Sequence, residues 1–509
     1  MSDLYKVFDD SQQRKSELYA ALDMGSNSFH LVVARVVADA VQIVSKVKQK
    51  VRLAEGLDSD HILSDEAIVR GVKTLESMQE ALQGVDPSAM RIVATHTLRR
   101  AKNARAFLRA AKKVFPYPIE IISGSEEARL IFVGVGSHQA NPGEKLVFDI
   151  GGGSTEFALG QGTDASMCKS LQMGCVVYNQ RYFSNGDINK KNTSDAITAA
   201  KVELEIVAGK LKNCAWQHTI ASSGTARSVC ASINLNLQQS IDTPVSYSQL
   251  QQLLHQCIKA SHYTNLNFDG LSDDRKPVFV AGLCILLAIY ESLQLNHITF
   301  SEAALREGVI YELQPTHSSQ NVRVRTAQSL ATRYDVDTTF AHKVLTTSMH
   351  IFDSVSVPWE LNLPHHRHLL GWSALLHEVG LHINSRSLQK HSSYVLLNSE
   401  LPGFNQDQQS IIAQLVRYHR KKVKWDDISQ ESSIEHQQLC YLLAILRISV
   451  LLNINRHKMN MPAFSVKAEA NSLYLKFEAE WFSLSPLLLA DLTKENTYLK
   501  ALDINLSIL

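Results

Sequence analysis

The chain has 509 residues, of which 45% are hydrophobic and 20% are charged, so a mainly disordered protein is excluded. At this length we expect roughly three to four domains. The formal net charge of +1 excludes a protein that coats nucleic acid through overall positive charge. A polyanion site must therefore come from local clusters, and no nucleic-acid partner is expected.

The seven cysteines are scattered and form no C-x-x-C pair. This usage is typical of reduced thiols and predicts a cytoplasmic protein without a disulfide framework or thiolate metal site. Residues 1–17 are polar, lack the apolar segment of a signal peptide and are expected to form a loose arm. The longest clean apolar run, Val278 to Tyr290, is too short for a membrane span and predicts a buried helix.

The first part of the chain alternates strand and helix patterns. Strands are expected at 18–23, 28–36, 41–47, 90–95 and 119–123, with helices at 65–83, 103–114 and 125–135. After a turn signal at Asn141-Pro142-Gly143 the pattern starts again. It gives strands at 145–150, 154–160 and 218–222, and helices at 190–213, 247–260 and 274–291. This predicts an α/β architecture in two copies.

After about Tyr311 the strand signals stop. Residues 320–456 have helical periodicity, whereas Ser472–Phe477 (SLYLKF) alternates again. We therefore expect four parts: α/β domains over 1–130 and 131–315, an all-α domain over 316–456, and a small mixed α/β domain over 457–509.

Two segments share one pattern: Leu18–Val36 (LYAALDMGSNSFHLVVARV) and Lys145–Leu159 (KLVFDIGGGSTEFAL). Each has an apolar strand ending in Asp-x-Gly, a turn of small and hydroxyl residues, and a second strand. Glycine lets the backbone approach a ligand closely, and successive N–H groups bind anionic oxygens. The candidate phosphate-binding residues are Gly25, Ser26, Asn27, Ser28, Gly151, Gly152, Gly153, Ser154 and Thr155. Asp23 and Asp149, at the strand ends, are placed to hold a hydrated divalent cation.

The alternative for either turn alone is an ordinary β-hairpin. Two matching turns, each opening an α/β half, favour a shared site in which they face each other and bind a phosphate chain. No G-x-x-x-x-G-K-[ST] motif occurs, which excludes a P-loop.

Phosphoanhydride hydrolysis needs an oriented water and a carboxylate to align or deprotonate it. Glu126 and Glu127 lie in ISGSEEARL at an expected helix start. Ser123-x-x-Glu126 fits a capping box, which explains Glu126 structurally and leaves Glu127 for chemistry. Glu156 closes the second turn and is a candidate catalytic residue that, with Asp149, could reach a metal. An edge-strand surface charge is the alternative for Glu156.

Arg99, in ATHTLRRA, follows an expected strand and could bind phosphate through two parallel hydrogen bonds. An ordinary surface arginine is the alternative. Cys175, in MGCV, is expected to be structural because no histidine partner for thiol chemistry is visible nearby.

These motifs together carry a family resemblance. The two turns and IASSGTAR at 220–227 resemble the three phosphate loops of the actin-like ATPase and sugar-kinase superfamily, which adds Ser223, Gly224 and Thr225 as candidates. The ordered phrases ALDMGSNSFHLVVARV, VATHTLRRAKN, PIEIISGSEEARLIFVGV, DIGGGSTEF, MGCV, SSGT and ALREGVIYE resemble the exopolyphosphatase and guanosine pentaphosphate phosphatase family.

The resemblance implies two actin-like (ribonuclease H-like) domains, an HD-like helical domain, a small C-terminal α/β domain and a homodimer. It implies Glu127 as the catalytic base and favours Arg99 over Arg100 as a catalytic residue. It also implies dependence on Mg²⁺, and stimulation by a monovalent cation is a further expectation.

The segment LLHEVGLHIN resembles the HD helix of metal phosphohydrolases, with Glu378 in place of the aspartate that binds metal there. We therefore expect a helical scaffold with satisfied histidines. A metal site at His342, His377 and His382 is the alternative.

A basic run, Arg417–Lys424 (RYHRKKVK), lies in the helical part, and Arg323, Arg325 and Lys46–Arg52 form other basic clusters. Such a run is usually a solvated face. The other hypothesis is a track for a long polyanion, carried by Arg417, Arg420, Lys421 and Lys422.

The phrases VATHTLRRA, PYPIEIISG, LHEVGLHIN, LPGFNQDQQ and VRYHRK resemble the long bacterial exopolyphosphatases. We therefore expect an exopolyphosphatase that removes terminal orthophosphate from inorganic polyphosphate by Mg²⁺-assisted in-line attack of water. The alternatives are a guanosine pentaphosphate (pppGpp) phosphatase of the stringent response and a non-hydrolytic actin-like nucleotide or polyphosphate sensor. Peripheral association with the inner face of the cell membrane stays open beside the cytoplasmic expectation.

Overall fold

The computed structural model describes most of the chain. The described residues are 18–37, 40–138, 143–211, 214–314, 320–361, 363–399, 401–428, 432, 434–454, 463–477 and 486–509. They divide after residue 319 into two compact units. The expected arm at 1–17 and the first two residues of the expected turn at 141–143 lie outside the described residues.

The first sheet has the strand order β3-β2-β1-β4-β5. Its strands are β1 (Leu18–Met24), β2 (Ser28–Val37), β3 (Ala40–Lys50), β4 (Met90–Ala94) and β5 (Ile119–Ile121). The first three strands pair antiparallel, and β4 and β5 continue the sheet parallel to β1. The expected strands are therefore confirmed.

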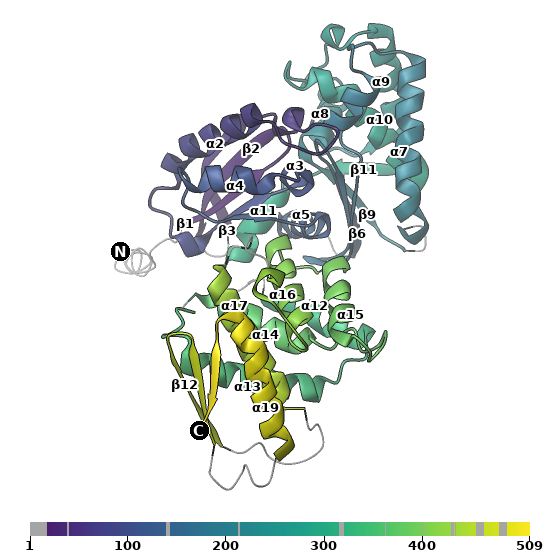
Figure 1. Cartoon of the computed structure of the whole chain (residues 1–509). Helices are drawn as coiled ribbons and strands as arrows, with labels where there is room; N and C mark the ends of the chain where they lie inside the picture. The colour runs from purple at the N-terminus through teal and green to yellow at the C-terminus, as the bar shows by residue number, and fades with distance from the viewer. Residues whose placement is uncertain are drawn as a thin grey trace, which may run out of the picture. The chain divides into compact units, whose positions relative to one another are not determined.

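Two pairs of helices cover the faces of this sheet (Figure 1). α2 (Asp65–Gln79) and α4 (Ala104–Lys112) pack their apolar residues on one face, and α5 (Gly124–His138) and α11 (Leu305–Leu313) on the other. α2 begins where the Ser64 side chain accepts a hydrogen bond from the backbone N–H of Ala67 (3.3 Å), which supplies the N-cap. The short α3 (His96–Arg100) follows β4.

The second sheet has the order β10-β11-β9-β6-β7-β8. Its strands are β6 (Glu144–Ile150), β7 (Thr155–Gln161), β8 (Asp164–Leu171), β9 (His218–Ser222), β10 (Val245–Ser246) and β11 (His297–Phe300). The run β8-β7-β6-β9-β11 repeats the order of the first sheet, with an antiparallel β6-β7-β8 meander and β9 and β11 parallel to β6. This confirms an α/β architecture in two copies.

The helices of the second half are α6 (Cys175–Tyr182), α7 (Lys190–Leu211), α8 (Ser223–Asn234), α9 (Tyr247–Ala260) and α10 (Lys276–Leu293). Among the described residues, α10 alone is long and apolar enough to cross a membrane, yet 72% of that stretch is buried inside the protein. It packs in the core with α6, α7 and α9. The expected buried helix at 278–290 is confirmed.

α5 and α11 cross at very short range, and two glycines permit the crossing. A Cβ atom on Gly134 would overlap the carbonyl oxygen of Ala304, and one on Gly308 would overlap that of Leu130. Any larger residue would push the helices apart. The crossing fixes the N-terminal turns of α5 and α11, which both reach the site described below.

A buried ion cluster joins the same two helices to the first sheet. Arg129 Nε donates to Glu126 (2.8 Å), and Arg129 Nη2 donates to Glu312 (2.9 Å). Arg91 lies 3.2 Å from Glu120 and 3.4 Å from Glu312. Buried charges are tolerated only when paired in this way, so the cluster fixes how α5 lies against α11.

The second unit begins with a bundle of helices. These are α12 (Gln320–Arg333), α13 (Thr338–Val355), α14 (Pro364–Leu376), α15 (Leu388–Asn398), α16 (Gln406–Tyr418) and α17 (His436–Leu452). A three-stranded sheet of β12 (Phe464–Glu469), β13 (Ser472–Phe477) and β14 (Asn505–Ile508), with α19 (Pro486–Leu499), shares their core. The helical region and the strand at 472–477 are as expected.

Candidate functional site

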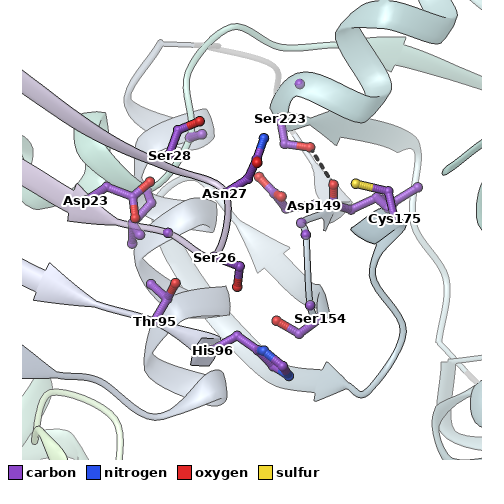
Figure 2. Close-up of a pocket in the computed structure, with 18 of the residues that line it drawn as sticks. Asp23, Ser26, Asn27, Ser28, Thr95, His96, Asp149, Ser154, Cys175 and Ser223 are labelled. Carbon is purple, nitrogen blue, oxygen red and sulfur yellow. Dashed lines mark hydrogen bonds between the residues drawn. The ribbon is translucent and has the colours of Figure 1, made fainter. Parts of the chain in front are cut away.

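Both hairpin turns line one cleft of about 170 Å³ in the first unit (Figure 2). The first turn supplies residues 25–28 and the second residues 151–154, and Ser223 and Gly224 of the third loop line it as well. The expectation that the two turns face each other across a cleft is confirmed.

The two turns are built alike at the atomic level. The N–H of Gly25 donates to the carbonyl of Ser28 (3.2 Å), and the N–H of Gly151 donates to that of Ser154 (2.9 Å). In register, Asp23 lies opposite His30 as Asp149 lies opposite Glu156. Each turn therefore presents a short run of backbone and hydroxyl groups to the cleft, as an anion site requires.

The turns also touch each other. A Cβ atom on Gly152 would lie 3.3 Å from the Cβ of Ser26, and one on Gly153 would overlap the ring of His96. Thr97 Oγ1 donates to Ser26 Oγ (2.9 Å), and this hydrogen bond ties the first turn to α3. Only glycine allows the second turn to approach the first so closely.

Three carboxyl groups line the cleft: Asp23, Asp149 and Glu127. Burial raises the pKa of Asp23 to about 7, opposed by Arg306. Burial also raises the pKa of Asp149 to about 6, opposed by a hydrogen bond from Ser222 Oγ (2.7 Å). The carboxylates raise one another's pKa because their charges repel, so the cleft accumulates negative charge that a cation would neutralise.

This donor set suits a hard divalent cation. Asp23 and Asp149 offer carboxylate oxygens from the two halves of the cleft, and Mg²⁺ typically takes one or two carboxylates and completes its shell with water and substrate phosphates. No group of three or more His, Cys, Asp or Glu side chains in the described part of the chain forms a complete protein cage. The residues therefore fit a hydrated Mg²⁺ and not a metal held by protein alone.

Glu126 and Glu127 lie in different environments, as the sequence predicts. Ser123 Oγ accepts from the N–H of Glu126 (3.1 Å), and the Glu126 carboxylate bonds Arg129 within the ion cluster. Glu127 faces the cleft instead. Burial raises the pKa of the Glu127 carboxyl, and the charge of Arg99 opposes that rise.

Arg99 lies in a different place from the one expected. Its Nη1 donates to Glu127 Oε2 (2.9 Å) and to the carbonyl of Ile122 (3.0 Å), and it lies behind Glu127 rather than in the cleft wall. The structure thus places Arg99 on Glu127 and not in the cleft lining, and direct phosphate binding by Arg99 stays a prediction. The surface alternative fails, since the side chain is mostly buried.

Three other candidates lie behind the cleft wall. The hydroxyl of Thr155 donates to the carbonyl of Met173, and that of Thr225 donates to the carbonyl of Ile150 (2.9 Å). Glu156 is buried and accepts from Ser170 Oγ (2.8 Å), and burial raises its pKa well above the usual range. These side chains support the loops from within, so the alternative of a surface charge for Glu156 is wrong.

Sequence reasoning missed the basic and histidine side chains of the cleft. His30, His96, Arg275 and Arg306 all line it. Arg306 Nη1 lies 2.7 Å from His30 Nδ1, and burial followed by the charge of Arg306 lowers the pKa of His30 to about 3. His30 is therefore neutral and accepts from Arg306. Arg306 stands in the phrase ALREGVIYE that carried the resemblance, whereas nothing in the sequence marked Arg275.

Cys175 lies at the cleft and is buried. Burial raises the pKa of its thiol, so it stays protonated, in agreement with the expected structural role.

The second unit gives no support to the HD-type metal alternative. His342 and His382 are exposed, and His377 is buried with Nδ1 bonded to the carbonyl of Ala374 (2.8 Å). The described side chains form no cluster suited to a metal there.

The basic run begins in the last turn of α16 and continues beyond it. Arg420, Lys421 and Lys422 are exposed, and Arg417 lies over the ring of Tyr418 at 5.2 Å. The side chain of Arg325 lies outside the described residues. The polyanion track stays a prediction.

Comparison with known proteins decides the family. A model described as the Ppx/GppA phosphatase family matches residues 32–317, and one described as Ppx/GppA phosphatase, domain III, matches residues 322–496. The chain belongs to the Ppx/GppA phosphatase family. Its actin-like fold agrees with an exopolyphosphatase of Cytophaga hutchinsonii, at a TM-score of 0.52 and 24% identity over 58% of this chain and 97% of that one. A PPX-GPPA enzyme of Aquifex aeolicus gives a TM-score of 0.50 and 24% identity, covering 58% of this chain and 98% of that one.

Curated relatives of this Ppx/GppA member match nearly end to end. A protein of Aeromonas hydrophila named guanosine-5'-triphosphate,3'-diphosphate pyrophosphatase is 38% identical over 92% of this chain and 93% of its own length. A protein of Pseudoalteromonas translucida with the same name is 36% identical over 95% of this chain and 96% of its own. As a Ppx/GppA phosphatase the chain is a phosphoanhydride hydrolase, built from two actin-like domains followed by a helical domain.

Proposed function

We propose that this protein hydrolyses the terminal phosphoanhydride of the 5'-triphosphate in guanosine pentaphosphate. The observation that carries the choice of substrate is the end-to-end match to relatives of that name, at 36% and 38% identity. It replaces polyphosphate, the substrate first expected, with the alternative. The exopolyphosphatase phrases remain the argument for polyphosphate as a second substrate.

The cleft supports this chemistry through its two turns. The N–H groups and hydroxyls of residues 25–28 and 151–154 would bind the oxygens of the terminal phosphates from both sides. Arg306, at the start of α11, adds positive charge, which stabilises the negative charge on the reacting phosphoryl oxygens.

Glu127 is the residue we assign to the attacking water. The water oxygen forms a bond to the terminal phosphorus, the bond from phosphorus to the bridging oxygen breaks, and Glu127 takes the proton of the water. The products are orthophosphate and a substrate one phosphate shorter. Arg99 supports the ionised form of Glu127, since their atoms lie 2.9 Å apart.

Mg²⁺ is the cofactor we propose, held by Asp23 and Asp149. When bound, it would neutralise charge on the phosphate oxygens beside these two carboxylates. A chelator is then expected to abolish turnover, and added Mg²⁺ to restore it.

Orthophosphate release measured side by side tests the substrate. With Mg²⁺ present, we expect kcat/KM for pppGpp to exceed that for long-chain polyphosphate by at least about tenfold, a difference of about 1.4 kcal/mol. A reversed ratio would identify an exopolyphosphatase. Binding of either compound without any release of orthophosphate would identify the non-hydrolytic sensor.

A further inference from the structure

The edge strand β3 carries lysines on the face of the first sheet that looks into the cleft. Lys48 pairs in register with His30, and Lys50 with Ser28. His30 and Ser28 both line the cleft. Because residues directly opposite on paired strands project to the same face, Lys48 and Lys50 stand beside the cleft mouth. Both are exposed to solvent.

Basic residues from the second half of the unit stand at the same mouth. The guanidinium of Arg275, just before α10, lies against Gly224, because a Cβ atom there would overlap it. Burial followed by the charge of Arg275 lowers the pKa of Lys48. Burial followed by the charges of Arg306 and Lys48 lowers the pKa of His30. These groups are near enough to repel one another.

The acidic side chain that acts on this cluster is Asp274, whose charge opposes the fall in the pKa of Lys48. Lys50 Nζ pairs with Asp274 (2.8 Å). Neither Lys48 nor Arg275 forms an ion pair with any other described side chain. One carboxylate thus faces three cations, Lys48, Lys50 and Arg275, and cations that lie close together raise the local positive potential, as in many anion sites.

We propose that Lys48 and Arg275, assisted by Lys50, form a second phosphate subsite that binds the distal anionic group of the substrate while the reacting phosphate lies in the turns. The proposal rests on the proposed function, in which that distal group is the 3'-diphosphate of guanosine pentaphosphate. With polyphosphate, the same subsite would bind later phosphates of the polymer. The shared chemistry is a phosphate group bound by lysine and arginine.

Paired substrates separate this role from a general effect on activity. GTP carries the same 5'-triphosphate as pppGpp and lacks the 3'-diphosphate. Because Lys48→Gln removes a charged donor to the distal phosphates, it is expected to lower the ratio of kcat/KM for pppGpp to that for GTP about tenfold. Lys73→Gln is the control, since Lys73 is exposed on α2, which packs on the opposite face of the same sheet. It should leave the ratio unchanged.

Assays with polyphosphate of two lengths distinguish failure of this subsite from failure of the proposed function. If the wild type prefers polyphosphate, the proposed function fails. The subsite then requires Lys48→Gln to lower kcat/KM for long-chain polyphosphate about tenfold more than for tripolyphosphate. The subsite is overturned if Lys48→Gln lowers kcat/KM equally for pppGpp and GTP in a protein that prefers pppGpp. It is likewise overturned by an equal loss on long-chain polyphosphate and tripolyphosphate in a protein that prefers polyphosphate.

Equilibrium binding gives a readout that needs no turnover. We expect Lys48→Gln to weaken ppGpp binding about tenfold more than GDP binding, in titrations of the full chain with each nucleotide. Equal weakening, or none, would overturn the proposal.

Discussion

Nη1 of Arg99 lies 2.9 Å from Oε2 of Glu127, so the guanidinium contacts the proposed base from behind the cleft. Burial raises the pKa of Glu127, and Arg99 opposes that rise. A general base must be ionised to take a proton, so we expect this pair to set the pH at which the protein becomes active.

Removing Arg99 should therefore move the pH profile. In Arg99→Gln the pKa of Glu127 rises further, so the acidic limb of the kcat profile shifts to higher pH and activity falls more at pH 6 than at pH 8. Arg100→Gln is the matched control, because Arg100 is exposed and bonds His61 (2.6 Å). A profile in Arg99→Gln that drops in height without moving along the pH axis would contradict the assignment.

Asp23 couples stability to pH. Its folded-state pKa of about 7 lies above the ordinary 3.8, so the folded protein binds more protons between these values and loses stability as the pH rises through them. We expect Asp23→Asn to raise the free energy of unfolding at pH 8 by about 1–3 kcal/mol and to lower activity. Urea titrations at pH 5 and pH 8 measure this. Asp195→Asn, an exposed change on α7, should shift neither value, and an equal gain there would refute the explanation.

The contact of the second turn with His96 of α3 predicts a rescue. Gly153→Ala places a methyl group into the His96 ring and should lower kcat/KM at least about tenfold, since the second turn must move away from α3. Adding His96→Ala removes the ring and should recover part of the loss, a coupling that a double-mutant cycle measures. Gly209→Ala is the control, because its new Cβ would meet no atom within 4 Å beyond its chain neighbours and the nearby backbone of its own helix. Strictly additive losses would count against the contact.

The buried ion cluster predicts a large stability effect at a distance from the cleft. Glu312→Gln weakens the pairing of Arg129 and Arg91 and should lower the free energy of unfolding by about 3 kcal/mol. Glu302→Gln breaks the exposed pair with Arg227 and should cost less than about 1 kcal/mol. Equal effects in denaturant titrations would show that the cluster does not stabilise the crossing of α5 and α11.

The sequence predicted the strands, the repeated turns and the hydrogen bond of Ser123 to the N–H of Glu126, because these depend on local periodicity and short-range hydrogen bonds. It did not predict the buried ion cluster of the Glu126 carboxylate. It missed α8, whose first turn holds Ser223, Gly224 and Thr225, since such residues have low helix propensity and tertiary packing overrides it. It also missed β8, where burial alternates only partly. Short apolar patterns of this kind do not separate strand from loop.

The contacts of the site were less predictable than its turns. Arg99 meets Glu127 across 28 positions of sequence, and the contact depends on how α3 packs against α5. Arg275 and Arg306 reach the cleft from α10 and α11, far along the chain from the turns. The substrate choice also changed, because short phrases favoured polyphosphate whereas the end-to-end relatives carry the pppGpp name.

The measurement that tests the central claim most directly is orthophosphate release from pppGpp by the wild type and by Glu127→Gln with Mg²⁺ present, with pppGpp affinity measured in parallel. If the two turns bind the substrate and Glu127 acts as the base, Glu127→Gln lowers kcat by at least about a hundredfold while pppGpp still binds. Wild-type turnover in Glu127→Gln would contradict the account.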